Sequence, residues 1–273
     1  MELGELTDDA LTGGFRLWQR RRGHRYSLDD TVTAWEAVRR CPGATRCLDL
    51  GCGIGSVLLM VAYKLPTAAM TGIEAQAQSF ELAGRNVTRN EVAARTTLLH
   101  GDLRDEGVLR QAGVGFDLVT GTPPYQPPGR GTVSPDPQRA HARVELRGGV
   151  EDYLAAAGRV VSDDGLVVVC GDSRHPDRVE QGAAAAGLRA ISRRDVIPAA
   201  GYKLPLFSVW TLGRAGASSE AMRAEPPFHA RDGGGGRTDD VRDLRAFFDL
   251  PMDPAEEPSP RERERTQRTG ERG

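Results

Sequence analysis

The sequence contains little cysteine or histidine, and neither residue is spaced for a metal site. The four cysteines, at positions 41, 47, 52 and 170, never form a CxxC pair, and the five histidines are scattered along the chain. Structural zinc sites bring their ligands together in closely spaced pairs. We therefore expect buried free thiols, no disulfide framework and no bound metal.

Long apolar runs and an excess of one charge are also missing. No stretch approaches the roughly 18 consecutive apolar residues of a membrane-spanning helix. The acidic opening, 1–14, lacks the basic start and apolar centre of a signal peptide. Lysine and arginine number 36 against 38 for aspartate and glutamate, a net charge of −2. The composition favours a soluble, cytoplasmic protein without a membrane partner, in which nucleic-acid binding would need a local basic patch.

Composition divides the chain into a core-forming part and a polar end. With 273 residues, 39% of them hydrophobic, the chain can bury the core of one ordinary domain with residues to spare. From about residue 216 it is rich in Arg, Glu, Pro and Gly, which predicts a mostly disordered charged tail over 216–273. Within it, apolar residues recur at helical spacing over 241–250. That stretch either docks on the domain or a partner, or forms a transient helix without a function.

Short apolar runs alternate with amphipathic stretches from residue 46 onward. The runs expected to be strands are 46–50, 69–74, 96–101, 116–121 and 166–171. The stretches expected to be helices are 55–64, 76–90 and 149–160. This alternation predicts a parallel sheet with helices on both faces, in which ligands bind beyond the carboxyl ends of the strands. Two further strands, 188–197 and 205–212, have no helix between them and predict an antiparallel hairpin at the sheet edge.

The stretch CLDLGCGIGS, 47–56, carries the first chemical signal. Gly51, Gly53 and Gly55 allow a tight turn and the close approach of a ligand just where a helix begins. The GxGxG spacing is one residue shorter than the GxGxxG of dinucleotide-binding turns, and Asp49 lies two residues before the first glycine. Alone, such a turn also serves as a plain strand-to-helix connection.

Two acids follow the next two predicted strands. Glu74 ends the second strand, at the distance from the glycine turn where an acid can bond the hydroxyls of a ribose. Asp102 follows the third strand, where a carboxylate can accept a hydrogen bond from an amine such as that of adenine. Each acid alone is more often a helix cap or a solvated loop residue. Together with the glycine turn, they favour a cofactor that carries a nucleoside.

The fourth predicted strand ends in a rigid motif, Thr122-Pro123-Pro124-Tyr125. Two consecutive prolines cannot continue a central strand or enter a helix interior, so they hold the chain extended. The directions of the Thr122 hydroxyl and the Tyr125 ring are thereby fixed. The plain alternative is a stiff loop without chemistry.

The motifs DLGCGIG, GIEAQ, HGDL and TPPY, in that order, resemble those of the class I S-adenosylmethionine-dependent methyltransferases. TPPY resembles the [N/D/S/T]PP[Y/F] motif of enzymes that methylate amino or amide nitrogens. The segment 13–37 is similar to the one before the glycine turn in bacterial tRNA adenine N6-methyltransferases and their methyltransferase small domain relatives. The likeness covers about 9–213. It implies a Rossmann-like α/β fold with a mostly parallel seven-stranded sheet, a covering segment at 1–45 and a methyltransferase domain at 46–215. The tail, 216–273, has no counterpart in the family.

The resemblance also implies S-adenosyl-L-methionine as cofactor, RNA and most of all tRNA as partner, and roles for individual residues. The implied cofactor-binding residues are Asp49, Gly51, Gly53, Gly55, Glu74, Asp102, Leu103 and Thr122. Thr122, Pro123 and Tyr125 are the implied catalytic residues, which would orient an amino group and stack on a flipped-out base. No general base beyond solvent or a carbonyl is implied.

The related tRNA enzymes carry Asn where this chain has Thr122, and Asn offers an amide where Thr offers only a hydroxyl. This difference leaves the target atom open. Adenine N6 is the first expected target, followed by the amino groups of cytosine and guanine and the amide of a protein glutamine. Two rivals are a catalytically idle cofactor-binding RNA module and a nucleotide-dependent oxidoreductase. The oxidoreductase is disfavoured because its glycine spacing differs and TPPY would have no role.

Two basic stretches, 20–22 and 126–149, and a helix cap between them complete the expected site. Arg20, Arg21 and Arg22 form a patch that predicts phosphate contacts with a substrate, although a solvated charged face is equally compatible. Downstream, Ser27 or Asp29 is expected to cap a helix. The loop 126–149 is long, Pro-rich and basic, which is typical of a lid over a substrate.

Overall fold

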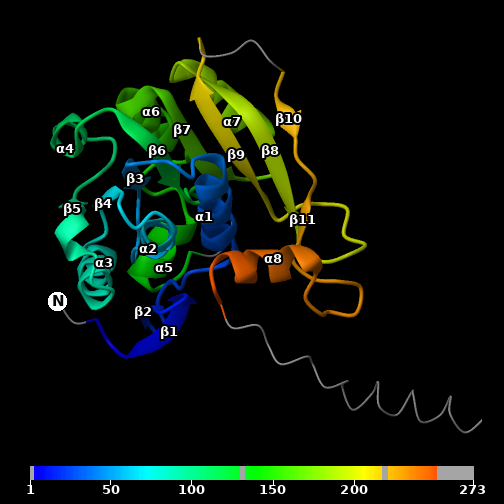
Figure 1. Ribbon diagram of the computed structural model, residues 1–273, viewed down its shortest axis with the longest axis horizontal. Coiled ribbons are helices and arrows are strands. Elements are labelled where there is room, and N and C mark those ends of the chain that lie inside the picture. The colour runs from blue at the N-terminus through cyan, green and yellow to red at the C-terminus, as the bar shows by residue number, and fades with distance from the viewer. Residues whose placement is uncertain (1–2, 130–132, 217–220, 251–273) are drawn as a thin grey trace, which may run out of the picture.

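The computed structural model describes residues 3–129, 133–216 and 221–250, which form an α/β fold around one large sheet (Figure 1). The strands of this sheet are β3 (Arg46–Leu50), β4 (Ala69–Glu74), β5 (Thr96–His100), β6 (Phe116–Gly121), β7 (Val161–Gly171), β8 (Leu188–Ile197), β9 (Phe207–Arg214), β10 (Arg223–Ala224) and β11 (Phe228–His229). Their order is β10-β8-β9-β7-β6-β3-β4-β5, and β11 also pairs with β8.

The pairing confirms the predicted mostly parallel sheet. Strands β5, β4, β3, β6 and β7 run parallel to one another, whereas β9 is antiparallel to both β7 and β8. The predicted terminal hairpin is therefore present. Within the described residues this sheet has nine strands rather than the seven implied by the resemblance, because β10 and β11 add at the β8 edge.

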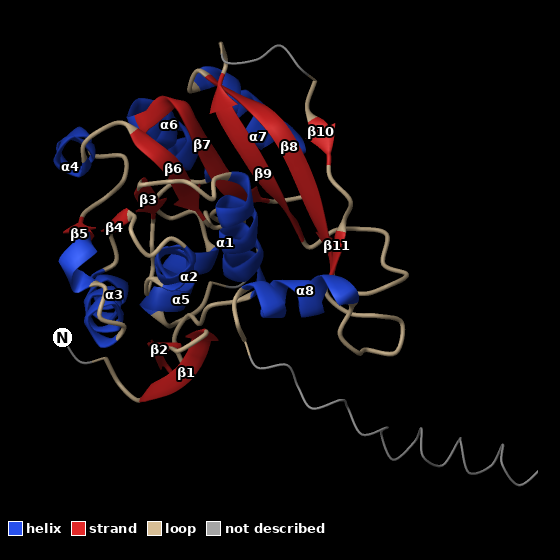
Figure 2. Cartoon of the chain, in the orientation of Figure 1, coloured by secondary structure: helices blue, strands red, loops and turns tan. Residues whose placement is uncertain are grey.

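Helices cover both faces of the sheet, as Figure 2 shows. The helices packed on one face are α1 (Leu28–Arg40), α2 (Ser56–Lys64) and α3 (Ala77–Arg89). The helices on the opposite face are α4 (Glu106–Ala112), α6 (Val150–Val160) and α7 (Pro176–Ala185). Two separate apolar cores result, one on each side of the sheet. Strand β3 is buried from Cys47 to Leu50 because Cys47 packs into one core and Leu48 and Leu50 pack into the other.

An N-terminal hairpin, which the sequence did not reveal, lies beside α2 and α3. Strands β1 (Leu6–Thr12) and β2 (Phe15–Arg20) pair antiparallel. The fully buried amide of Asn86 on α3 ties this hairpin to the glycine turn. Its oxygen accepts a hydrogen bond from the Trp18 backbone at 2.7 Å, and its nitrogen donates to the carbonyls of Trp18 and Ile54 at 3.0 and 2.9 Å. Three bonds to one buried side chain fix where the hairpin sits.

Residues 221–250 require a correction to the predicted disordered tail. Besides β10 and β11, they form α8 (Asp239–Phe247), which crosses below α1 in Figure 1. Phe228 is buried edge-on against Trp35 of α1, and Leu244 and Phe248 are buried as well. Few apolar residues suffice here because each enters a core that the domain has already built. Docking of 241–250, one of the two outcomes considered, is thus found. Residues 251–273 lie outside the described part of the chain.

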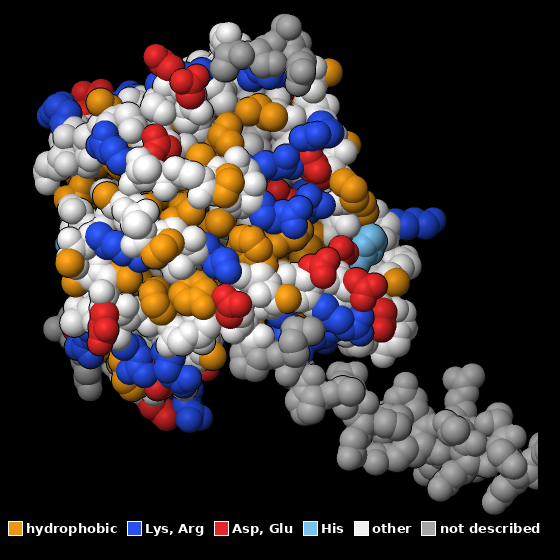
Figure 3. All heavy atoms as spheres, viewed as in Figure 1, with side chains coloured by type: hydrophobic (Ala, Val, Ile, Leu, Met, Phe, Trp, Pro, Cys, Tyr) orange, Lys and Arg blue, Asp and Glu red, His pale blue; other side chains and the backbone are white. Residues whose placement is uncertain are grey.

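The surface carries charges of both signs. Figure 3 shows basic and acidic side chains interspersed on the face that bears α1 and α8. None of the described helices is both long enough and apolar enough to cross a membrane. All four cysteines are free, and three of them are buried, as predicted.

Candidate functional site

Two adjoining hollows lie at the carboxyl ends of the parallel strands. The first is lined by the glycine turn, the ends of β4 and β5, and α5 (Pro137–Arg143), which lies over it. The second, of about 960 Å³, is lined by the segment before α1, by the TPPY motif and by the residues that follow β7. The residues that line both hollows are His24, Tyr26, Asp30, Thr122, Pro124 and Ala142.

The glycine turn has the conformation that its sequence predicts. Gly51, Gly53 and Gly55 have φ angles of 60°, 56° and 88°, in the left-handed region that favours glycine. A Cβ on Gly51 would lie 2.1 Å from the Tyr153 hydroxyl, whereas one on Gly53 would meet nothing within 4 Å. Gly51 and Gly53 line the first hollow, and Gly55 instead caps the start of α2.

Glu74 lies in the wall of the first hollow, and two backbone N–H groups hold its carboxylate in place. One carboxylate oxygen accepts from the Gly53 backbone nitrogen at 2.8 Å and the other from the Gln76 nitrogen at 2.6 Å. The side chain is buried, and burial raises its pKa while these backbone bonds act in the opposite direction. The remaining lone pairs can accept from the hydroxyls of a ligand.

Asp49 occupies a different place from the one that the resemblance implies. It does not line either hollow but lies behind the glycine turn, 2% exposed. It accepts from the Thr120 hydroxyl at 2.8 Å and from the Leu58 backbone nitrogen at 3.2 Å. Burial raises its pKa to about 7. The geometry supports a role in joining β3, β6 and the start of α2, and any influence on a ligand would be indirect.

Asp102 and Leu103 both line the first hollow, as expected. The Asp102 carboxylate is held by the Arg104 guanidinium in two bonds of 3.0 and 2.7 Å. These bonds hold the pKa of Asp102 below its usual range. The carboxylate therefore stays ionised at the rim of the hollow, where it can accept a hydrogen bond from an amine.

The TPPY motif stands where the two hollows meet. The Thr122 hydroxyl donates to the Asp30 carboxylate at 3.4 Å. The Tyr125 hydroxyl donates to the Cys170 sulfur at 2.7 Å and lies 3.4 Å from the Asp29 carboxylate. The Tyr125 ring is stacked with Phe207, with ring centroids 6.5 Å apart. Tyr125 is thus anchored at its hydroxyl and contributes to the lining of the second hollow.

Asp30 is the buried acid at this junction, in the first turn of α1. Ser27 is the N-cap of the helix, as predicted, and its backbone nitrogen donates to Asp30 at 2.9 Å. The second Asp30 oxygen is the one that faces Thr122. Burial, followed by the neighbouring Asp29, raises the pKa of Asp30 to about 8.

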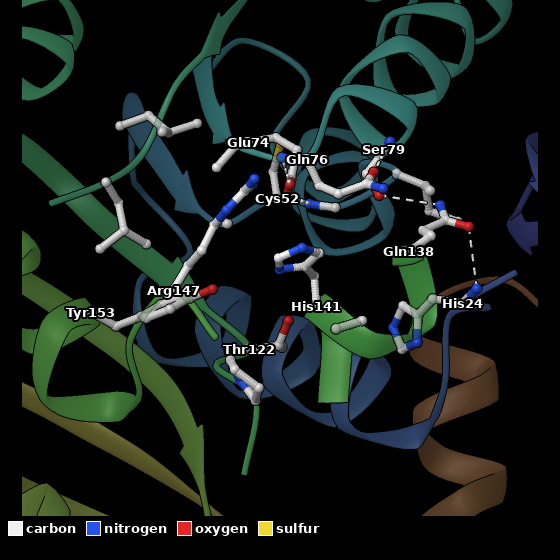
Figure 4. A pocket seen from close by; sticks show the side chains of 18 of the residues that line it. His24, Cys52, Glu74, Gln76, Ser79, Thr122, Gln138, His141, Arg147 and Tyr153 are labelled. Carbon is white, nitrogen blue, oxygen red and sulfur yellow. Dashed lines mark hydrogen bonds between the residues drawn. The ribbon is translucent and has the colours of Figure 1, made fainter. Parts of the chain in front are cut away.

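Helix α5, within the predicted lid 126–149, is tied down over the first hollow. Gln138 is 1% exposed, its nitrogen donates to the Ser79 hydroxyl at 3.1 Å, and its oxygen accepts from the His24 backbone at 3.2 Å, as Figure 4 shows. Arg20 forms an ion pair of 2.8 Å with Asp136, just before α5. The volume of the first hollow is about 110 Å³, below the roughly 300–1,000 Å³ of typical ligand sites, which is consistent with a closed roof.

The three predicted substrate-binding arginines separate in the structure. Arg20 is largely buried in its ion pair and holds α5. Arg21 is exposed and pairs with Glu5 at 2.9 Å. Arg22 is exposed, and its backbone carbonyl accepts from the Arg139 guanidinium. Arg21 and Arg22 are therefore placed at the surface, where they can contact a substrate, whereas Arg20 holds α5 in position.

His141 on α5 is a site residue that sequence reasoning missed. Figure 4 shows its ring in the middle of the first hollow, between Glu74 and Thr122. Its Nδ1 atom is buried and has no hydrogen-bond partner among the described residues. Burial, with Arg147 nearby, lowers its pKa, so the ring is neutral near pH 7. A single histidine in a basic loop gave no spacing from which this position could be inferred.

The second hollow is lined by charged groups of both signs. The basic and imidazole side chains are His24, Arg25, Arg139, Arg143, Arg174 and His175, and the acids are Asp29, Asp30 and Asp172. No group of three or more His, Cys, Asp or Glu side chains within the described ranges is placed to hold a metal ion. The hollow can thus contact a polar substrate at the point where Thr122 is presented.

Comparisons with known proteins agree with this geometry. Residues 37–134 match the family model described as the methyltransferase small domain. A release factor glutamine methyltransferase of Geobacter sulfurreducens is 36% identical over 123 residues, which cover 44% of this chain and 41% of that protein. A tRNA1(Val) (adenine(37)-N6)-methyltransferase of Porphyromonas gingivalis is 32% identical over 124 residues, which cover 45% of this chain and 48% of that protein.

The chain therefore spans less than half the length of these two curated relatives. Among solved structures, a protein of Agrobacterium tumefaciens described as a predicted O-methyltransferase superposes with a TM-score of 0.60 at 20% identity. That alignment covers 81% of this chain and 96% of the other. The likeness establishes the fold, a Rossmann-like class I methyltransferase fold.

Proposed function

Because residues 37–134 match the methyltransferase small domain and the chain has a class I methyltransferase fold, we propose that this protein transfers a methyl group from S-adenosylmethionine to an amino nitrogen, the N6 of an adenosine in tRNA. The observation that carries the proposal is the position of Thr122. It lies at the end of β6, in the wall shared by a hollow suited to a nucleoside and a hollow open to a polar substrate.

The residues of the first hollow fit the cofactor that the family implies. Gly53 leaves open space beside the backbone, and the fixed Glu74 carboxylate is suited to the two hydroxyls of a ribose. Asp102, ionised beside Arg104, is suited to the amine of an adenine ring. The unpartnered Nδ1 of His141 offers one more polar contact inside the hollow. When bound, the cofactor supplies an electrophilic methyl group on a positively charged sulfur.

The residues of the TPPY motif orient the nitrogen that accepts the methyl group. The Thr122 oxygen can accept a hydrogen bond from one N–H of an amino group, and the Pro123 carbonyl can accept from the other. Two such bonds aim the nitrogen lone pair, which is otherwise delocalised into the base. The Tyr125 ring, anchored through Cys170, offers a flat surface to a base that has left its stack.

Two observations support RNA as the substrate. The second hollow includes Arg143 and Arg174 among its lining side chains, and Arg22 is exposed on the neighbouring loop. The tRNA1(Val) methyltransferase of P. gingivalis supports adenine N6 in particular. The release factor relative favours a second candidate, the side-chain amide of a glutamine in a protein. Both candidates require an N–H to be held by the TPPY motif.

The test uses the purified protein with S-adenosylmethionine labelled in its methyl group. Bulk tRNA lacking its modifications and a recombinant bacterial release factor are offered separately, and the labelled nucleoside or peptide is identified by mass spectrometry. We expect N6-methyladenosine in the tRNA digest. Label on a glutamine would replace the first candidate by the second, and label on neither, with the cofactor bound, would contradict both.

A further inference from the structure

Asp30 and Thr122 form a pair at the boundary between the two hollows. The Asp30 side chain is buried, 7% exposed. One of its two oxygens is held by the Ser27 backbone and the other accepts from the Thr122 hydroxyl at 3.4 Å, and the Ser56 side chain also hydrogen-bonds to the carboxyl. That distance is long for a hydrogen bond between two oxygens, as is common at sites that tighten only with their ligands bound. Both residues line the first and the second hollow.

We propose that Asp30 is the proton acceptor of the methyl transfer and acts through the Thr122 hydroxyl, which relays the proton from the methylated nitrogen. The proposal rests on the proposed function and adds a residue to it, because the sequence implied no general base. Thr122 touches the substrate nitrogen, and Asp30 acts through Thr122.

Atoms and charges balance in this step. The nitrogen lone pair forms the new N–C bond while the S–C bond breaks and its electron pair stays on sulfur, so the nitrogen carries one proton too many. That proton passes to the Thr122 oxygen as the hydroxyl proton of Thr122 passes to the Asp30 carboxylate. The products are a neutral methylated amine, an unchanged Thr122 and a protonated Asp30, which returns its proton to solvent when the site opens.

The pair gives a reason for Thr in place of Asn. An Asn side chain accepts an N–H through its amide oxygen without help, whereas a free hydroxyl can turn its hydrogen toward the substrate. Bonding to Asp30 takes up the hydroxyl hydrogen and leaves the Thr122 lone pairs directed at the substrate. Thr122 therefore needs the acid, and the acid needs Thr122 to reach the nitrogen.

The surroundings decide when Asp30 is ionised. The titratable groups that interact with it are Asp29 on the same helix, Asp49 on β3, Tyr26 on the preceding loop, Tyr125 of the motif and Cys170 on β7, and His24 lines the same hollow. Burial and the two acids favour the protonated form, with a pKa of about 8. A positive charge in the first hollow acts in the opposite direction. With a cationic cofactor in the first hollow, Asp30 would therefore favour the carboxylate form, and with the neutral, demethylated product it would do so less.

The first arm of the test measures binding alone. Titration calorimetry near pH 7, in two buffers of different ionisation enthalpy, gives the protons released when S-adenosylmethionine or its demethylated product binds. The wild type should release up to about one proton with the cationic cofactor and almost none with the neutral product. Asp30→Asn, whose amide oxygen can still accept from Ser27, should release none. Equal release by the wild type and Asp30→Asn would overturn the proposal.

The second arm measures single-turnover rates against pH, on whichever of tRNA or release factor the wild type labels. Asp30→Asn and Thr122→Val should each lower the single-turnover rate about 100-fold and abolish the dependence of that rate on pH. The rate of the double variant should be little lower than that of either single variant. Asp239→Asn, an exposed acid in the first turn of α8, is the matched control and should match the wild type. Full activity of Asp30→Asn would overturn the proposal.

The two arms separate the proposals. If the wild type labels no acceptor, the proposed function fails, and the binding arm still shows whether Asp30 releases its proton to the cationic cofactor. If Asp30→Asn does not fold, the proposal is tested with Thr122→Val instead, by its proton release on binding the cofactor and by the pH dependence of its rate. In that case, an unchanged profile in Thr122→Val would overturn the relay.

Discussion

The backbone carbonyl of Phe248 accepts a hydrogen bond from the Thr12 hydroxyl at 2.6 Å and another from the Gly13 backbone nitrogen at 2.8 Å. Phe248 and Thr12 are separated by 236 positions in the chain. The end of α8 is thereby fixed to the turn of the N-terminal hairpin. Nearby, Asp249 bonds to Tyr63 and Lys64 of α2.

Truncation after residue 215 should therefore destabilise the protein by several kcal/mol. It removes the buried side chains of Phe228, Leu244 and Phe248, and each buried side chain of this size contributes about 1.5–3 kcal/mol. The free energy of unfolding, measured by urea titration, checks this. A chain ending at Leu250 is the control because it keeps every one of these contacts. Identical midpoints for the full chain and both truncated chains would show that 221–250 adds nothing to the core.

Glu74→Ala should weaken the binding of S-adenosylmethionine and of its demethylated product alike, by about tenfold to a hundredfold. Loss of a hydrogen bond to a carboxylate costs about 1.5–3 kcal/mol, and the ribose is common to both molecules. Asp102→Ala should act in the same direction. Calorimetry measures both affinities, with Glu81→Ala on the exposed face of α3 as control. Unchanged affinity in both site variants would refute the assigned orientation of the cofactor.

Tyr125→Ala should reduce affinity for the RNA substrate by about 1–3 kcal/mol and leave cofactor affinity near that of the wild type, because the ring would stack on a base. Tyr125→Phe keeps the ring and loses only the hydroxyl, with its bond to Cys170 and its contact to Asp29, so it should bind RNA nearly as well as the wild type. Filter binding with the tRNA that the wild type methylates provides both RNA affinities. Equal RNA affinity of Tyr125→Ala and the wild type would argue against stacking.

Gln138→Leu should speed the release of bound cofactor by about tenfold. The substitution retains the volume of a buried side chain but removes its bonds to Ser79 and His24, each contributing about 0.5–1.5 kcal/mol to the closed roof. Dissociation of labelled cofactor, followed by filtration after a chase, measures the rate. Gln181→Leu on the exposed surface of α7 is the matched control. A rate equal to that of the wild type would mean that α5 does not have to open.

Asp49→Asn should flatten the dependence of stability on pH. Folding raises the pKa of this carboxyl from 3.8 to about 7, so its contribution is present below the lower value and lost as pH rises through the higher. A difference of one between the folded and unfolded pKa corresponds to about 1.4 kcal/mol of unfolding free energy. Denaturant titrations from pH 4 to about pH 8 should show the wild type losing stability relative to Asp49→Asn. Parallel curves would show that Asp49 ionises as freely in the folded protein as in the unfolded chain.

The strand ranges, their parallel direction and the edge of the sheet that carries the candidate residues could be predicted because they depend on local patterns. Short apolar runs followed by glycine or an acid mark the carboxyl ends of parallel strands, and these ends meet at one edge of the sheet. Gly51, Glu74 and Thr122 accordingly line one hollow, although they are distant in the chain.

The misassigned residues depend on partners that the sequence cannot place. Arg20 has the same side chain as its exposed neighbour Arg21, but Asp136 and Gln138, which lie far along the chain, bind its guanidinium and turn it inward. Asp49 and Glu74 are both acids at strand ends, yet the pleat directs Asp49 toward Thr120 and the start of α2. The apolar residues of 221–250 are too few to predict a packed core from sequence, because α1 and the hairpin supply the other residues of that core.

Strands β10 and β11 also change what the sheet can do with other molecules. Both pair in parallel with β8, and without them the backbone groups along that side of β8 would be available to a strand from another chain. The segment 221–250 thus occupies the outer side of β8 as an internal substitute for a partner strand. Strand addition by a second copy or a peptide at this position would first have to displace residues of the same chain.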